Sequence, residues 1–215
     1  MAELLSSIRK CKECEIPKRC TPCVFGSATS KILIVSDRPP ETQYRGTRSA
    51  CVALGDQMAK GALEIEPEFF KKDWLDVSDA FSPKYFFWIH RANCFSSEYD
   101  RCSSMFLEKA IRLVEPSLIL VFGAVAAGYF FLNSWKRLLD LVRRRDLVYD
   151  RQGVFSNCRV LFHWSKETRA SSWPKKKPEY QEAKEASLRD ASKAVHEILA
   201  QMGFRRVLLP DSSAR

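Results

Sequence analysis

The segment Lys31-Ile32-Leu33-Ile34-Val35-Ser36-Asp37-Arg38-Pro39-Pro40 predicts the central strand around which the chain is organised. Its aliphatic run shows no polar alternation, which is typical of a strand buried on both faces of a parallel sheet. The two prolines then end the strand in a rigid loop, because proline has no N–H to donate to a ladder. Ligands bind at this carboxyl edge in open α/β sheets. We therefore expect either a site at this loop or, more plainly, an ordinary strand exit.

Three further apolar runs predict strands, and they alternate with segments of helical apolar spacing. This order predicts a single three-layer α/β/α domain over residues 1–210, with a mostly parallel sheet of about four strands, followed by a disordered tail at 211–215. The predicted strands after the first cover residues 85–89, 118–122 and 159–162, and the predicted helices cover residues 4–10, 50–63, 103–114, 123–127 and 179–202.

The composition favours an intracellular protein with a polyanionic partner. The chain has 215 residues, a formal net charge of +9 and 46% hydrophobic residues. A surface of that sign attracts phosphate backbones, so DNA, double- or single-stranded, is the expected partner. We find no signal peptide and no apolar run long enough to span a bilayer. We therefore expect a monomer in the cytoplasm or at the nucleoid, without a membrane partner.

Eight cysteines in a reducing compartment indicate metal or cluster ligation rather than disulfides. Two C-x-x-C pairs, Cys11 with Cys14 and Cys20 with Cys23, could bind one zinc ion together. If only one pair belongs to the site, an iron–sulfur cluster becomes competitive, and Cys94 and Cys102 are the candidates for the remaining ligands. The other two cysteines, Cys51 and Cys158, are interpreted as small core residues.

Three predicted strand ends carry polar groups: Ser36-Asp37-Arg38-Pro39-Pro40, His90, and His163-Trp164-Ser165. Together with the cysteines and the helix opening Phe122-Gly123-Ala124-Val125-Ala126-Ala127, this order resembles the iron–sulfur branch, or family four, of the uracil-DNA glycosylase superfamily. Those proteins run C-x-x-C, Gly-Glu-(Ala/Gly)-Pro-Gly, Thr-Asn before a third cysteine, a fourth cysteine, Leu-Gly-x-x-Ala and His-Pro-(Ser/Ala). The resemblance covers roughly residues 8–200.

The resemblance implies a DNA glycosylase that excises uracil or another deaminated base. It implies a 4Fe-4S cluster held by Cys11, Cys14, Cys94 and Cys102, with zinc as the alternative metal. Asp37 would position or activate the attacking water, and His163 would donate to the uracil carbonyl as negative charge develops. Residues expected to bind the base are His90, Ser36, Arg38 and Ser49, and those expected to contact DNA are Arg169, Lys175, Lys176 and Lys177.

The pocket motifs also depart from that family. Both glycines of its first motif are replaced, and Pro40 cannot donate a backbone hydrogen bond. Ser49 lies where the family carries a stacking phenylalanine, His90 replaces the asparagine that reads uracil's edge, and Trp164 replaces a proline. A catalytically inactive iron–sulfur DNA-binding protein of the same fold is therefore the alternative function.

Simpler structural roles also remain open for individual residues. Asp37 could cap a turn or pair with Arg38, and His90 could be a buried, hydrogen-bonded histidine. His196 is expected to be structural or solvated, and the basic runs could be solvated surface only.

Overall fold

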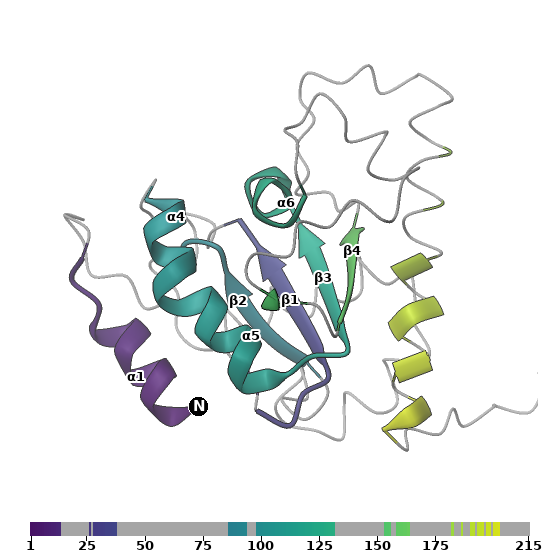
Figure 1. Ribbon diagram of the computed structural model, residues 1–215, viewed down its shortest axis with the longest axis horizontal. Coiled ribbons are helices and arrows are strands. Elements are labelled where there is room, and N and C mark those ends of the chain that lie inside the picture. The colour runs from purple at the N-terminus through teal and green to yellow at the C-terminus, as the bar shows by residue number, and fades with distance from the viewer. Residues whose placement is uncertain are drawn as a thin grey trace, which may run out of the picture.

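A computed structural model describes residues 1–13, 26, 28–37, 86–93, 98–131, 153–155 and 158–163, together with scattered helical positions between 182 and 202. Within these residues the core is a four-stranded, all-parallel sheet (Figure 1). The strand order is β2-β1-β3-β4, so the predicted central strand has a neighbour on each side. The strands are β1 (Ile32–Ser36), β2 (Phe86–His90), β3 (Leu118–Phe122) and β4 (Arg159–His163).

The predicted α/β class with a parallel sheet is confirmed. Every residue of β1, β2 and β3 is buried, as expected for strands covered on both faces. The strand β3 ends at Phe122 as predicted, whereas β1, β2 and β4 extend one residue further into the polar exits, because Ser36 pairs with His90 and His163 pairs with Phe122 in the ladder. The sheet edge therefore includes the very residues that were predicted to follow it.

The described helices are α1 (Ala2–Lys10), α4 (Tyr99–Cys102), the π-helical turn η2 (Ser103–Leu107), α5 (Glu108–Val114) and α6 (Ala124–Phe130). The helix predicted to begin at residue 103 thus begins four residues earlier and contains a π-helical segment. It ends as predicted before Pro116, and Glu115 takes the left-handed conformation with φ of 45°. The prolines and apolar spacing could not reveal the π-helical turn, because a π-turn has no proline or glycine signature of its own.

The two faces of the sheet contact different parts of the chain. Alternate strand residues, including Leu33, Val35, Phe87 and Ile89, share one core cluster with α1, α5 and α6. The residues between them, including Ser36, Trp88 and His90, point to the opposite face. Next to β4, Arg159 forms a 3.8 Å ion pair with Glu197 of the C-terminal helical segment.

Several predicted elements lie outside the described residues. These are the helix at residues 50–63, much of the helix at 179–202, the domain end at 210 and the tail at 211–215. In the described part of the chain, no helix combines the length and the hydropathy needed to cross a bilayer.

Candidate active site

Asp37 follows β1 directly and is fixed against the start of α6. Its Oδ1 accepts a 2.7 Å hydrogen bond from the backbone N–H of Ala126. Gly123, the N-cap of this helix, has φ of 88°, and a Cβ there would lie 2.5 Å from Asp37 Cγ. Asp37 therefore supplies, from another strand, the capping acceptor that a glycine lacks. This bond orients the carboxylate at the edge of the sheet.

Ser36 and His90, paired across β1 and β2, form a buried polar cluster with Trp88. Ser36 Oγ lies 2.6 Å from His90 Nδ1 and accepts a 2.9 Å hydrogen bond from the indole N–H of Trp88. The rings of Trp88 and His90 lie 5.1 Å apart at a tilt of 53°. His90 is fully buried and Ser36 is 2% exposed. The alternative of a buried, hydrogen-bonded histidine is thus what the structure shows for His90, while base recognition stays a prediction.

The chain after β2 runs beside the chain after β1. Arg91 N–H donates to the carbonyl of Ser36 at 2.7 Å, and Ala92 N–H donates to the carbonyl of Asp37 at 3.0 Å. Asn93 Oδ1 accepts from the backbone N–H of His90 at 3.1 Å. These bonds hold the predicted site residues of two strands at one edge.

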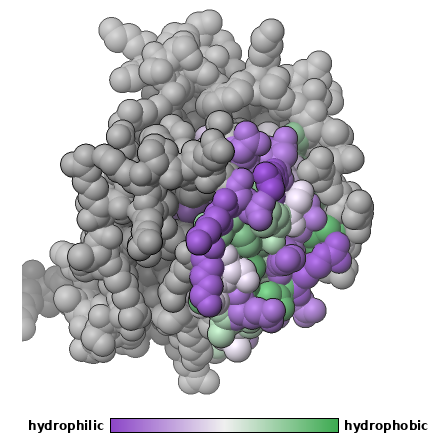
Figure 2. Space-filling view, turned by 90° about the vertical axis from the view of Figure 1, so that its left-hand side faces the viewer, coloured by the Kyte–Doolittle hydropathy of each residue, from purple (hydrophilic) through white to green (hydrophobic). Residues whose placement is uncertain are grey.

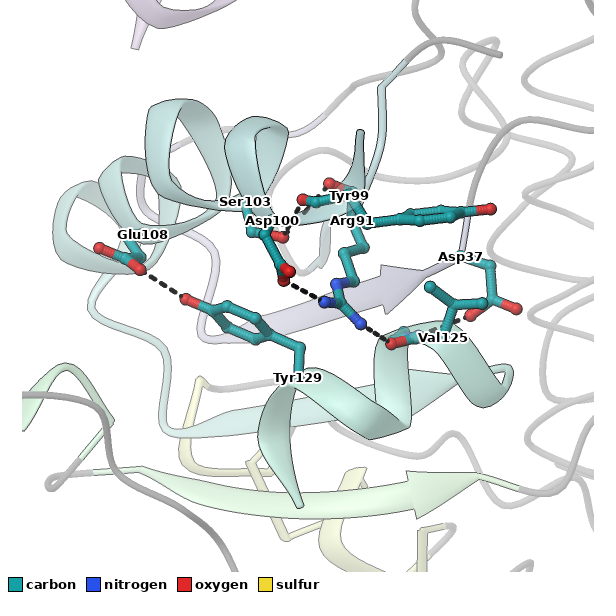
Figure 3. Close-up of polar contacts among 9 residues, drawn as sticks. Asp37, Arg91, Tyr99, Asp100, Ser103, Glu108, Val125 and Tyr129 are labelled. Carbon is teal, nitrogen blue, oxygen red and sulfur yellow. Dashed lines mark hydrogen bonds and ion pairs between the residues drawn. The ribbon is translucent and has the colours of Figure 1, made fainter. Parts of the chain in front are cut away.

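Arg91 is a residue that the sequence analysis missed. Its guanidinium donates to the carbonyl of Val125 on α6 and pairs with Asp100 on α4 at 2.5 Å (Figure 3). It also lies over the rings of Tyr99, 5.7 Å to the centroid, and Tyr129, 5.5 Å to the centroid. Arg91 therefore joins the helix that carries Cys102 to the helix that receives Asp37.

His163 ends β4 at the same carboxyl edge, and only its backbone is described. β4 lies two strands from β1, which corresponds to about 10 Å between their backbones, and three strands from β2, about 14 Å. Asp37, His90 and His163, which are far apart in sequence, therefore meet along one rim of the sheet.

Cys102 is buried, and its sulfur accepts two amide hydrogen bonds from Asn93, from the backbone N at 3.3 Å and from Nδ2 at 3.7 Å. Cys94 directly follows Asn93 in the chain. On the other side of Cys102, Arg101 pairs with the carboxylate of Glu13 and donates to its carbonyl at 3.3 Å. Glu13 directly precedes Cys14. The chain neighbours of three predicted cluster ligands are thus held together.

Other predicted residues are placed differently or not at all. Cys11 is exposed just after α1. Cys158, predicted to be a core residue, is half-buried and packs against the core cluster, and its thiol donates to the carbonyl of Phe155 at 3.3 Å. No group of three possible metal ligands lies within the described residues. Outside these residues lie Arg38, Ser49, Cys14, Cys20, Cys23, Cys51, Cys94, Arg169, Lys175, Lys176, Lys177 and the side chain of His196.

A cavity and a surface in the described part of the chain do not contribute to the rim that carries Asp37, His90 and His163. A cavity of about 560 Å³ is lined by Lys31, Pro116 and Ser117, which precede β1 and β3, so it lies at the amino edge of the sheet. Figure 2 shows that the described part of the face near α1 is mostly hydrophilic. Its exposed side chains have both signs, as with Lys12 and Glu13, so this part is not a basic patch.

A scan against models of protein families finds no match, and a search of curated proteins finds no similar sequence.

Proposed function

We propose that the protein is a DNA glycosylase of the uracil-DNA glycosylase type, which removes uracil or another deaminated base from DNA. The observation that supports this most strongly is the common rim: Asp37, His90 and His163 lie at the carboxyl ends of β1, β2 and β4, which are three parallel strands of one sheet. Ligand sites of open α/β sheets form at this edge. The net charge of +9 suits a nucleic-acid partner.

In this proposal the target nucleotide leaves the duplex and enters the rim. The bond between sugar C1′ and the base nitrogen breaks, and its electron pair leaves with the base. The oxygen of a water molecule forms the new bond to C1′, and Asp37, oriented by Ala126, positions that water and accepts its proton. His163 donates to the base as negative charge develops on it. The products are a free base and an abasic site.

We also propose that Cys11, Cys14, Cys94 and Cys102 hold a 4Fe-4S cluster. The donors around Cys102 fit such a group, because two amide N–H groups aimed at one sulfur stabilise a thiolate. The Glu13–Arg101 pair brings the chain next to Cys14 to the same place. The cluster would act as a structural tie between the N-terminal segment and the exit of β2. Zinc in the same site is the alternative, and iron analysis with visible absorbance distinguishes the two.

Incubation with oligonucleotides that contain uracil, hypoxanthine or xanthine, followed by alkali, tests the activity. We expect strand cleavage at one or more of these bases and none at their normal counterparts. Absence of cleavage at all three bases would contradict the proposal.

A second candidate is a non-catalytic iron–sulfur DNA-binding protein of the same fold. It is favoured by one specific observation: His90 and Ser36 are buried and bonded to each other, which is the arrangement expected of structural residues. It predicts salt-sensitive DNA binding that is indifferent to the modified base. Tighter binding to uracil-containing DNA than to matched normal DNA would count against it.

A further inference from the structure

The buried cluster of Ser36, Trp88 and His90 determines which ring nitrogen of His90 carries the proton. The indole N–H of Trp88 can only donate, so its 2.9 Å bond occupies a lone pair of Ser36 Oγ. The second contact of this oxygen among the described residues is His90 Nδ1, at 2.6 Å.

Of these two partners, the one that can accept the hydroxyl proton of Ser36 has to be identified. The indole offers no acceptor, and Ser36 is only 2% exposed to bulk solvent. Donation to His90 Nδ1 satisfies the hydroxyl and gives the short distance typical of an O–H donor. An Nδ1 that accepts is unprotonated, and a neutral imidazole then carries its proton on Nε2.

We propose that Trp88, acting through Ser36, is a positioning residue that fixes His90 as the neutral Nε2–H donor, so that the site selects a base by its carbonyl. This inference rests on the proposed glycosylase function and names its substrate class. The group read is the 4-carbonyl of uracil or the equivalent 6-carbonyl of hypoxanthine. Cytosine and adenine carry an amino group at that position, and two donors facing each other cannot bond.

The same geometry limits how well the site can distinguish one carbonyl-bearing base from another. An amide side chain offers a donor and an acceptor together, so it can read a carbonyl and its neighbouring ring N–H. The Nε2–H of His90 offers only the donor. We therefore expect uracil and hypoxanthine to bind within about tenfold of each other, and both to bind at least about tenfold more tightly than cytosine and adenine.

The protonation state can be measured without any activity. The chain has three histidines, so a protein labelled with ¹⁵N in histidine gives a simple ring-nitrogen spectrum, in which loss of one set in His90→Gln identifies His90. We expect an unprotonated Nδ1 and a protonated Nε2 for His90. In Trp88→Phe, which lacks the indole N–H, we expect these signals to move towards a mixture of the two forms. A protonated Nδ1 in the wild-type protein overturns the proposal.

A matched core variant separates positioning from loss of stability. Phe87 is as buried as Trp88 but points to the opposite face of the sheet. Phe87→Leu should therefore destabilise the protein while leaving the His90 signals unchanged. Ser36→Thr keeps the hydroxyl and should retain the wild-type signals, whereas Ser36→Ala should lose them. An unchanged His90 spectrum in both Trp88→Phe and Ser36→Ala overturns the positioning role.

Base selection is tested by binding to the full-length protein. Oligonucleotides with 2′-fluoro sugars resist cleavage of the glycosidic bond, so affinities for uracil, hypoxanthine, cytosine and adenine can be compared directly. Equal affinity for uracil and cytosine contradicts carbonyl selection. These readouts do not need base release, so a protein that prefers uracil but releases no base would contradict the proposed function and leave this inference standing.

Discussion

At the scale of single residues, Asp37 has two separable tasks. Its Oδ1 caps α6 through Ala126 N–H, and in the proposed reaction its carboxylate positions water. From the sequence, Asp37 could either cap a turn or act on water; the structure shows the capping bond, and the action on water stays a prediction. A carboxylate at a helix N-terminus stabilises the helix and is held in one orientation, so capping α6 and positioning water are compatible roles.

The variant Asp37→Asn separates them. The amide oxygen still accepts from Ala126, so we expect the free energy of unfolding to fall by less than about 1 kcal/mol. Base excision should fall about 100-fold or more, because the amide cannot accept the proton of water. Urea unfolding and single-turnover excision measure the two effects. Excision within tenfold of wild type would leave Asp37 with the capping role alone.

Gly123 gives a second residue-level prediction, because it contacts the same carboxylate. Gly123→Ala puts a Cβ 2.5 Å from Asp37 Cγ at a backbone φ of 88°, so we expect a loss of stability of about 2 kcal/mol or more. Gly128→Ala is the matched control: it lies within α6, and its Cβ would approach no closer than 3.8 Å to Arg91 Nη1. That change should be neutral or stabilising by up to about 1 kcal/mol. Equal thermal stability of the two variants would contradict this description of the turn.

At the scale of elements, the strands could be predicted from the sequence, whereas the side-chain contacts that join the strand ends to the helices could not. Aliphatic runs such as Ile32-Leu33-Ile34-Val35 are buried on both faces, so their hydrophobicity alone indicates a parallel strand. Arg91 gave no comparable signal. Its partners lie on α4 and α6, which the fold brings close to Arg91. No spacing of residues in the sequence predicts these contacts. Trp88 could have been linked to His90 from the sequence, because residues two apart in a strand share a face.

The Arg91 contacts predict how strongly α4 is tied to α6. Its side chain is 12% exposed and bonds to a carbonyl, a carboxylate and two aromatic faces, so Arg91→Met should lower the free energy of unfolding by about 3 kcal/mol. Its partner Asp100 is 82% exposed, and solvent screens that pair. Asp100→Asn should therefore cost less than about 1 kcal/mol. Chemical denaturation of both variants checks the order, and a larger loss for Asp100→Asn would contradict it.

At the scale of the whole molecule, the fold brings the exits of β1, β2 and β4 to one rim and the neighbours of Cys14, Cys94 and Cys102 to one place beside it. The common edge of the strand exits was predicted from the sequence, whereas the cluster of Cys11, Cys14, Cys94 and Cys102 stays a prediction. The contacts of Asn93 with Cys102 and of Arg91 with Val125 could not be predicted, because their partners are brought to them by the fold.

Replacing single cysteines tests the proposed cluster. Cys102→Ser should lose iron and visible absorbance and should destabilise the protein, because Asn93 directs two amide donors at that sulfur. Cys158→Ser is the matched control, since its half-buried thiol donates to the carbonyl of Phe155, which a hydroxyl can also reach. Iron content should be unchanged in that variant. Equal iron content in both variants would exclude Cys102 as a ligand.

The central claim is that the rim of Asp37, His90 and His163 breaks a glycosidic bond. The most direct measurement detects the released base itself, by mass spectrometry, after single-turnover incubation of wild-type protein and Asp37→Asn with uracil-containing DNA. We predict free uracil from the wild-type protein, at least about 100-fold more slowly from the variant, and an abasic site in equal amount. Absence of free uracil, or equal release by the two proteins, would contradict the claim.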